Sequence, residues 1–497
     1  MTHPPADYDV VIIGAGISGI NTAYHLQTEV PNNRYAILEG RGNIGGTWDL
    51  FRYPGIRSDT DLHTFGLPWN PWMEDRAIAD GGSIVRHLQE SAAKHAIDSN
   101  IRFHHRVVAA EWSSDDQLWS LRVEVSTPED DSNALTTISI LTRFLVLGTG
   151  YYDYREPLSA HIPGLKERFQ GTTIHPQFWP QDLDYTNKRI VIIGSGATAI
   201  TLLPNLAAKA KHVTMLQRSP TYIMSINNST ANSWLHKILP ASMVFQVLRI
   251  FFLCVPVIIY YFCRLFPSTA RRINHNHVAK QLPAHIKPDP HFNPLYKPWD
   301  ERLCFTPDGD FFESMRKGNA TVETGHIKAV TPDGILLQSG QFIPADIIVT
   351  ATGLKLEVGG GMQLRVDGQT ATLAGRYAWN SALVHDIPNF AFVMGYTNAP
   401  WTLGAETTAV LVCRILRRMR KNGLTSVVPR LDNPESLRPT PMWNLKATYV
   451  KEAGKWMPKC GHEGPWKPRS IYFVDILKAR YGNFTDGLQF YRGSKAV

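Results

Sequence analysis

Short apolar runs that end on glycine-rich turns organise the first half of the chain. Tyr8–Ile13 predicts a strand, Gly14–Gly19 a turn, and the positions to about Glu29 a helix. A second apolar strand, Tyr35–Leu38, ends on Glu39. Strand, glycine turn, helix, strand and acid in this order predict a βαβ unit with the spacing that dinucleotide binding requires.

The same pattern returns later in the chain. Arg189–Ile193 predicts a strand, Gly194–Ala199 a turn, and Val213–Leu216 the next strand, which is followed by Gln217 and Arg218. Short apolar runs separated by Gly-containing turns follow, and these predict β hairpins. The chain therefore contains two Rossmann-like units whose second strands end with opposite charge.

A strand that ends in a small residue, Thr and Gly stands on each side of the second unit. Leu147–Gly150 precedes it and Thr350–Gly353 follows it. This symmetry predicts an α/β fold in which one dinucleotide-binding domain is inserted into another. We expect residues 1–150 and 335–497 to form the discontinuous domain with a C-terminal tail. Residues 151–334 would form the inserted domain, with a helical subdomain at about 225–300.

The segment Ile250–Cys263 is almost wholly apolar, with Arg249 and Arg264 at its ends. These fourteen residues are fewer than the ~20 that span a bilayer. We expect a core or subdomain helix. Interfacial association with a membrane, which Arg271 and Arg272 would favour, is the alternative.

Composition narrows the classes of protein to consider. The 497 residues suggest about three structural units, and 43% hydrophobic with 19% charged residues excludes wholesale disorder. The net charge of +8 comes from 51 bases interspersed with 43 acids, without a long basic tract. We therefore expect polyanionic cofactors and no nucleic-acid partner.

The number and spacing of the cysteines indicate the cellular compartment. The five cysteines are odd in number and show neither a CxxC nor a metal-ligand spacing, which disfavours a disulfide framework and a zinc site. No secretory signal is read at the start of the chain. We expect a cytoplasmic protein, with peripheral attachment to a membrane as the alternative.

The first glycine turn predicts phosphate binding. Gly14 permits the tight turn, Gly16 lets the backbone approach a pyrophosphate, and Gly19 packs the helix against the strand. The helix N-terminus offers free N–H groups to the phosphates. Glu39 can accept hydrogen bonds from ribose hydroxyls and would repel a 2′-phosphate, which favours the adenosine half of FAD or NAD.

The second turn has the opposite preference. It is formed by Gly194, Ser195, Gly196, Ala197, Thr198 and Ala199. Ala199 replaces the third glycine, and the following strand ends on Arg218 and Ser219, which favour the 2′-phosphate of NADPH. Two adjacent nucleotide sites of opposite preference imply hydride transfer from a nicotinamide to a flavin.

Two longer motifs narrow the chemistry. Phe169–Pro180 reads FQGTTIHPQFWP, and Gly45–Trp48 is followed by Tyr53–Asp59. These stretches resemble the fingerprints FxGxxxHxxxW(P/D) and GGxWxxxx(F/Y)PGxxxD of class B flavoprotein monooxygenases, type I Baeyer–Villiger monooxygenases. The similarity extends through Pro298–Cys304 and Gly395–Asn398. Within the family, the chain is similar to the ethionamide-activating monooxygenase subgroup.

The resemblance implies an enzyme in which NADPH reduces FAD and a C4a-peroxyflavin forms with O2. One oxygen atom would enter a hydrophobic ketone to give an ester or lactone, with sulfides or thioamides as further substrates. A flavin monooxygenase limited to S- or N-oxygenation is the alternative. An NADPH oxidase that makes only peroxide and a non-enzymatic membrane-associated protein are more distant ones.

The resemblance also assigns site residues. Arg302 corresponds to the arginine beside the flavin, where a permanent cation would stabilise a peroxide anion. Asp59 corresponds to the active-site aspartate that would orient it, with a structural ion pair as the alternative. His175 is a candidate for direct chemistry or for a role in the domain linker. Residues at cofactor-contacting positions are Ser18, Thr47 and Val107 for FAD, Arg57 and Ser58 for the nicotinamide cofactor, and Asp59. Packing against FAD is favoured for Trp48, with a core aromatic as the alternative.

Overall fold

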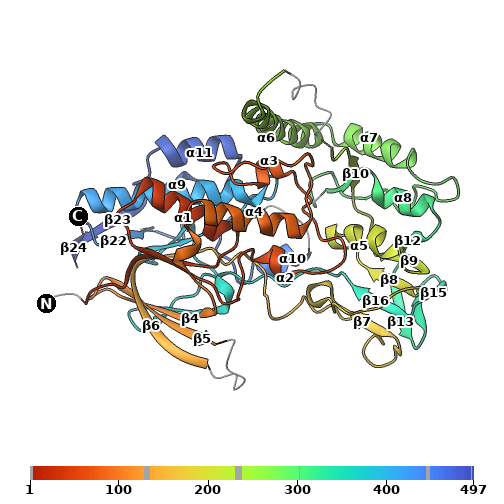
Figure 1. Cartoon of the computed structure of the whole chain (residues 1–497), viewed down its shortest axis with the longest axis horizontal. Helices are drawn as coiled ribbons and strands as arrows, with labels where there is room; N and C mark the ends of the chain where they lie inside the picture. Colours follow the sequence, from red (N-terminus) through yellow and green to blue (C-terminus); the bar gives the residue numbers. More distant parts are fainter. Residues whose placement is uncertain are drawn as a thin grey trace.

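Two α/β units lie side by side, and both chain termini belong to the same unit (Figure 1). The computed structural model describes residues 4–127, 135–229, 238–301, 303–431, 433–443, 448–493 and 495–496. In Figure 1 the unit on the left contains the red N-terminal and the blue C-terminal segments, and the unit on the right contains the yellow and green middle of the chain. The predicted insertion of one domain into another is confirmed.

The first unit is built on a mixed 11-stranded sheet. In pairing order its strands are β18 (Gln369–Thr370), β17 (Gln363–Val366), β4 (His105–Ser113), β5 (Leu118–Ser126), β6 (Leu135–Leu147), β1 (Tyr8–Ile13), β2 (Tyr35–Leu38) and β3 (Ile101–Arg102), with β19 (Ala378–Trp379), β20 (Leu383–Val384) and β21 (Phe390–Phe392) joined through β6. β1 pairs in parallel with β2 and β6. Its alternate residues enter two cores, Val10 and Ile12 on one face and Val11 and Ile13 on the other. A strand covered on both faces is a continuous apolar run, as this one is.

Helices from both ends of the chain cover one face of this sheet. They are α1 (Ile17–Glu29), α4 (Gly81–Lys94), α9 (Trp401–Lys421) and α11 (Tyr472–Tyr481). Ile20 of α1, Leu88 of α4 and Val412 of α9 are buried in one core. Because α9 completes this core, the C-terminal segment is an integral part of the first unit.

The second unit has a sheet of five parallel strands. In pairing order these are β12 (Ala320–Thr324), β9 (His212–Gln217), β8 (Arg189–Ile193), β16 (Ile347–Thr350) and β7 (Thr172–Ile174). Helices α5 (Ala197–Ala207) and α8 (Asp310–Arg316) pack on one face, with Leu202 and Phe311 buried between them and the sheet. The three-stranded hairpin sheet of β13 (Ile327–Thr331), β14 (Gly334–Leu337) and β15 (Phe342–Pro344) packs on the other face.

The chain returns to the first unit after Thr350, whereas the sequence predicts that it returns near Ile335. β14 contributes Ile335 to the core of the second unit, and β16 pairs in parallel with both β8 and β7. Ile347–Val349 are buried and apolar, so this strand requires a parallel partner on each side, and the second sheet provides both.

The remaining elements are shorter or lie at the edges of the two units. They are α2 (Thr47–Leu50), α3 (Leu62–Phe65), α7 (Pro267–Ala279), α10 (Thr448–Ala453), β10 (Ile223–Ile226), β11 (Cys304–Pro307), β22 (Ser426–Pro429), β23 (Leu488–Arg492), β24 (Lys495–Ala496) and the 3₁₀ turns Asp98–Asn100, Pro176–Phe178, Gly359–Gly361 and Gly464–Trp466.

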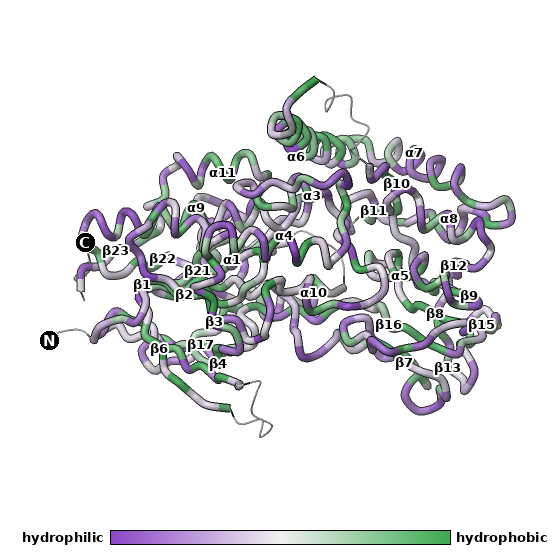
Figure 2. The backbone as a smooth tube through the Cα atoms, in the orientation of Figure 1, coloured by the Kyte–Doolittle hydropathy of each residue, from purple (hydrophilic) through white to green (hydrophobic). Residues whose placement is uncertain are grey.

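Helix α6 (Ala241–Leu265) is longer and more exposed than the apolar run predicts. Among the described residues, Ser242–Leu265 is the one helix with the length and composition to cross a membrane, and only 11% of its apolar window is buried. A core helix is therefore excluded, and the subdomain helix of the same expectation remains. The helix continues through Pro256 and lies at the upper edge of the molecule, where Figure 2 shows it largely green.

A buried ionic cluster links α1 to α9. His25 Nδ1 lies 2.8 Å from Glu29 Oε1, and His25 Nε2 lies 3.0 Å from Glu406 Oε2. Arg417 and Arg480 approach the same two carboxylates at 3.2 and 3.8 Å. Burial alone lowers the pKa of His25, but the hydrogen bonds and charges of both glutamates outweigh it and raise the pKa to about 9.

We predict that the protein loses stability as the pH rises through about 9. A folded-state pKa raised from 6.5 to about 9 contributes stability that is complete below pH 6.5 and is lost above it. Between pH 6.5 and about pH 9, the free energy of unfolding should fall by up to about 3 kcal/mol. Denaturant titrations at a series of pH values measure it. The His25→Gln variant should be less stable at neutral pH and lack this decline, and an equal decline in both proteins contradicts the assignment.

The two units meet at the loop Tyr53–Asp59. Tyr53 packs against the core of the second unit. Gly55 has φ +74°, and a Cβ there would lie 2.0 Å from Asn205 Nδ2 of α5. Arg57 pairs with Asp310 at the start of α8, and its Nη2 lies 3.3 Å from Asp310 Oδ1. This loop therefore holds the second unit through one close backbone approach and one ion pair.

We predict that Gly55→Ala weakens the junction between the units. Gly368→Ala is the matched control, because Gly368 has φ +76° but nothing within 4 Å of its Cβ position. Both variants carry the same backbone strain. A Cβ at position 55 also forces Asn205 to turn away and lose its 2.7 Å hydrogen bond to Thr201 O, which should cost Gly55→Ala a further ~1 kcal/mol. Denaturant titration of both variants gives this difference. Equal stabilities would show that the loop does not need the close approach.

Candidate active site

A cavity of about 920 Å³ lies between the two units. Gly14 and Gly16 of the first glycine turn line it, and so do Ala197 and Thr198 of the second. The segment from Tyr396 to Trp401, which leads into α9, closes another side. The two predicted nucleotide turns, 180 residues apart in the sequence, therefore open on one shared space.

The described structure divides the predicted residues into two groups. Those that line the cavity are Gly14, Gly16, Ser18, Glu39, Thr47, Trp48, Arg57, Ser58, Asp59, Val107, Ala197 and Thr198. Those that do not line it are Gly19, His175, Gly194, Ser195, Gly196, Ala199, Arg218 and Ser219. Arg302 lies outside the described residues.

The first turn has the geometry of a phosphate cradle. A Cβ at Gly19 would lie 1.9 Å from Gly14 O, so only glycine permits this contact between α1 and β1. Gly16 is the N-cap of α1 and supplies no side-chain cap, so the first N–H groups of the helix stay available to an anion. These observations fit the pyrophosphate of FAD.

Glu39 lies at the end of β2, beside this cradle. It is buried; Oε2 accepts from Ala15 N at 2.8 Å and Oε1 accepts from Arg41 N at 2.9 Å. Burial raises the pKa of Glu39, and the two backbone hydrogen bonds oppose that rise. A carboxylate oxygen can accept more than one hydrogen bond. Glu39 therefore holds the turn and can still accept from a ribose hydroxyl.

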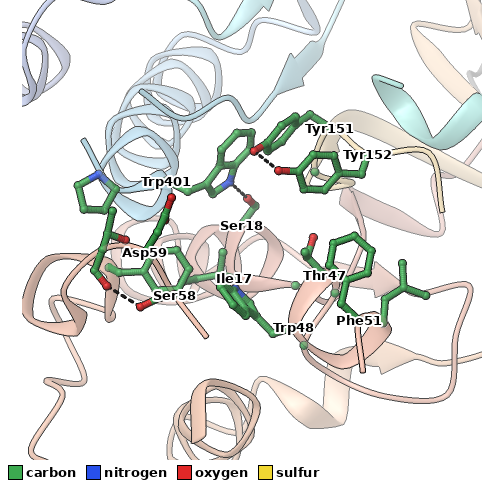
Figure 3. A pocket seen from close by; sticks show the side chains of 18 of the residues that line it. Ile17, Ser18, Thr47, Trp48, Phe51, Ser58, Asp59, Tyr151, Tyr152 and Trp401 are labelled. Carbon is green, nitrogen blue, oxygen red and sulfur yellow. Dashed lines mark hydrogen bonds between the residues drawn. The ribbon is translucent and has the colours of Figure 1, made fainter. Parts of the chain in front are cut away.

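The wall next to the first glycine turn combines polar anchors with aromatic rings. Ser18 Oγ accepts from Trp401 Nε1 at 2.8 Å, and Thr47 Oγ1 lies 3.2 Å from the Tyr154 hydroxyl. Tyr151 stacks on Trp401 with ring centroids 4.7 Å apart. Figure 3 shows Ser18 and Trp401 facing one another from α1 and α9. Trp401, Tyr151 and Tyr154 are site residues that the sequence patterns did not single out.

The second turn is also an open cradle. Gly196, the N-cap of α5, supplies no side-chain cap, while Ala199 is fully buried where α5 packs on its sheet. Ser195 Oγ donates to Ser219 O at 3.1 Å, which ties the turn to the residues that follow β9. Arg218 and Ser219 are exposed beside the turn, as a 2′-phosphate site requires.

His175 occupies a linker position. Its Nδ1 accepts from Gln177 N at 3.2 Å, and its Nε2 lies 3.3 Å from Gly353 O. Burial lowers the pKa of His175, and the hydrogen bond to Gly353 opposes this. These contacts join the turn after β7 to the turn after β16. Of the two candidate roles of His175, this position favours the one in the domain linker, because both ring nitrogens contact the linker and the side chain lies outside the cavity lining.

Asp59 lines the cavity at the end of the loop Tyr53–Asp59 (Figure 3). Trp299 and Leu303, on either side of position 302, line it as well. The two segments to which the resemblance assigns the active-site pair therefore reach the same cavity.

Helix α6 forms an apolar wall of the cavity. Phe251, Phe252, Val255, Pro256 and Ile259 of α6 line the cavity. Positions 252, 255, 256 and 259 are three or four residues apart and therefore share one face of a helix. This spacing is the sequence signal that could have predicted that one face of α6 points into the protein. The fold and the site together define a two-dinucleotide flavoprotein oxidoreductase with an apolar chamber.

Comparisons with known proteins agree with this class. The profile of the family described as pyridine nucleotide-disulphide oxidoreductase matches residues 8–244. The chain is 44% identical over 487 residues to the FAD-containing monooxygenase EthA of Mycobacterium tuberculosis, covering 97% of each chain. It is 40% identical to the probable FAD-binding monooxygenase AlmA of Acinetobacter baylyi, covering 97% of this chain and 95% of that one.

Solved structures share the fold. The structure of OTEMO in complex with FAD and NADP superposes with a TM-score of 0.71 at 19% identity, covering 98% of this chain and 100% of that one. An oxidized steroid monooxygenase bound to NADP gives 0.70 at 20% identity, covering 97% and 99%. The protein belongs to the family of FAD-containing monooxygenases, and it uses O2 and an organic substrate.

We predict that Arg218→Ala weakens the binding of NADPH far more than the binding of NADH. A charge-assisted pair with a phosphate is worth about 1.5–3 kcal/mol, so the KM for NADPH should rise about tenfold or more. The KM for NADH, which lacks the 2′-phosphate, should change less than about twofold. Steady-state oxidation of each nucleotide measures both. Equal effects on the two nucleotides would refute the assignment of Arg218.

Proposed function

We propose that the protein is an NADPH-dependent Baeyer–Villiger monooxygenase that converts hydrophobic ketones into esters or lactones, with sulfides or thioamides as further substrates. The observation that carries this proposal is the shared cavity, on which both nucleotide cradles and an apolar wall open. One oxygen atom of O2 enters the substrate and the other leaves as water, with two electrons from NADPH.

The cradles support the two cofactors. FAD would fit the first, where Glu39 would accept from its ribose hydroxyls and the N-terminus of α1 would bind its phosphates. NADPH fits the second, with Arg218 and Ser219 beside the N-terminus of α5. When bound, FAD accepts a hydride from NADPH and supplies the activation of O2.

The remaining chemistry falls to the chain's own side chains. Asp59 offers a carboxylate at the cavity, and Arg302, by its match to the family pattern, offers a cation that stays protonated. A fixed positive charge in a site with little water stabilises developing negative charge far better than solvent does. The carboxylate would orient this guanidinium.

The apolar wall supports a hydrophobic substrate. Phe252, Val255 and Ile259 from α6, together with Leu303 and Phe305, place apolar surface in the cavity that Asp59 also lines. Such a wall gains free energy by covering a substrate's hydrocarbon part, at about 25 cal/mol per Å². It also excludes water from the reacting atoms.

We predict that Arg302→Ala abolishes oxygen transfer without abolishing cofactor reduction. The variant should keep its FAD and its NADPH-dependent flavin reduction, while ester formation falls about 100-fold or more and peroxide release rises. Gas chromatography of a methyl ketone reaction and a peroxide assay measure the two. Arg302→Lys is the control, because it keeps the charge and loses the planar fork.

Product formed by Arg302→Ala at the parental rate would disprove the role. Incubating the native enzyme with a methyl ketone and with a methyl aryl sulfide separates the main proposal from its alternative. Ester product supports Baeyer–Villiger chemistry. Sulfoxide without ester shows an enzyme limited to sulfur or nitrogen oxygenation.

A further inference from the structure

Helix α6 presents an exposed apolar face to solvent. Its 25 residues extend about 37 Å. The side chains on the outer face are Met243, Val247, Ile250, Ile258, Tyr261 and Leu265. Ile258 is 66% exposed and Leu265 70%. Soluble proteins rarely leave a continuous apolar strip of this kind uncovered, so the face is a binding surface.

The opposite face of α6 belongs to the protein. Phe252, Val255 and Ile259 line the active-site cavity, and Phe252 stacks on His63 of α3 with ring centroids 5.2 Å apart. Arg249 Nη1 donates to His63 O at 2.7 Å. A helix crossing a bilayer alone would have to leave these contacts. The structure therefore favours a helix that lies along a membrane surface.

The end of α6 is tied to the segment that precedes Arg302. Arg264 Nη1 donates to Asp300 Oδ1 at 2.9 Å, and Tyr260 contacts the ring of Trp299 edge to face at 5.6 Å. The exposed helix is thus part of the wall of the active site and not an appendage. Whatever covers its outer face lies within one helix diameter of the cavity.

The charge around α6 indicates an anionic surface as the occupant. The sequence has no Asp or Glu between Tyr185 and Pro288. Arg272 and Lys280 are exposed in and directly after α7, the helix that packs against α6. Apolar side chains flanked by exposed bases are typical of interfacial helices, whose attraction to anionic lipids adds to apolar insertion. A second copy of the chain would bring like charge to this face.

We propose that α6 lies in the interface of an anionic bilayer, with its outer face among the acyl chains and its inner face as the wall of the cavity. A lipophilic substrate then passes along α6 from the bilayer into the cavity without crossing bulk water. The docking of α6 stands independently of the catalytic activity, whereas delivery of the substrate rests on the proposed function.

Vesicle sedimentation of the FAD-loaded full chain tests the docking. The native protein should sediment with phosphatidylcholine vesicles that contain phosphatidylglycerol, and less with phosphatidylcholine alone or at high salt. The double variant Ile258→Gln, Leu265→Gln should bind anionic vesicles at least about tenfold more weakly. Neither side chain lines the cavity, and glutamine adds no charge.

Leu135→Gln is the matched control. Leu135 is 59% exposed at the start of β6, and Figure 1 shows β6 on the side of the molecule away from α6. The variant should bind as the native protein does. FAD absorbance and the unfolding midpoint establish that each variant is folded. Binding of the double variant to anionic vesicles at the native level overturns the proposal. So does a native protein that does not bind vesicles but forms a dimer that the double substitution dissociates.

Two ketones test the delivery. With a long-chain methyl ketone carried in anionic vesicles, the double variant should raise KM at least about tenfold. With cyclohexanone in water, the KM should stay within about twofold. Equal changes for both ketones overturn delivery through α6. If the native enzyme oxygenates neither ketone, the proposed function fails, and the sedimentation result still decides the docking.

Discussion

The packing of the loop Tyr53–Asp59 against the second unit is the contact on which the active site depends. Hydride transfer requires reacting atoms about 3–3.5 Å apart, so two nucleotide cradles on separate units are useful only if their relative position is held. Gly55 brings the backbone of one unit against Asn205 of the other, and Arg57 pairs with Asp310 across the boundary. A missing side chain and an ion pair together set the spacing of the cradles.

Charge is distributed around that junction in a way that separates the two cofactors. Both cradles begin a helix whose N-terminal amides lack a side-chain cap, so each attracts phosphate. The buried carboxylate of Glu39 stands beside one, and the exposed Arg218 stands beside the other. The difference in charge of a single residue after each second strand is the basis on which we propose opposite nucleotide preferences for the same local fold.

Helix α6 joins the chamber to the surface. Its inward residues Phe252 and Ile259 belong to the cavity, while Ile258 and Leu265 face outward. The basic excess that composition alone would assign to polyanionic cofactors is in part located beside this helix, at Arg272 and Lys280. A substrate pocket with a lipophilic outer wall suits an enzyme whose substrates partition into membranes.

The sequence by itself determined both nucleotide-binding units, because strand, turn, helix and charged residue follow within about thirty positions and depend on local sterics and periodicity. It also identified the Asp59 loop through its motif. Tertiary structure decided what depends on distant partners: β16 joins the second sheet through β7 and β8, His175 serves a linker through Gly353, and α6 lines the cavity through its contact with His63. An apolar run has no preferred side until the fold gives one face a neighbour and leaves the other exposed.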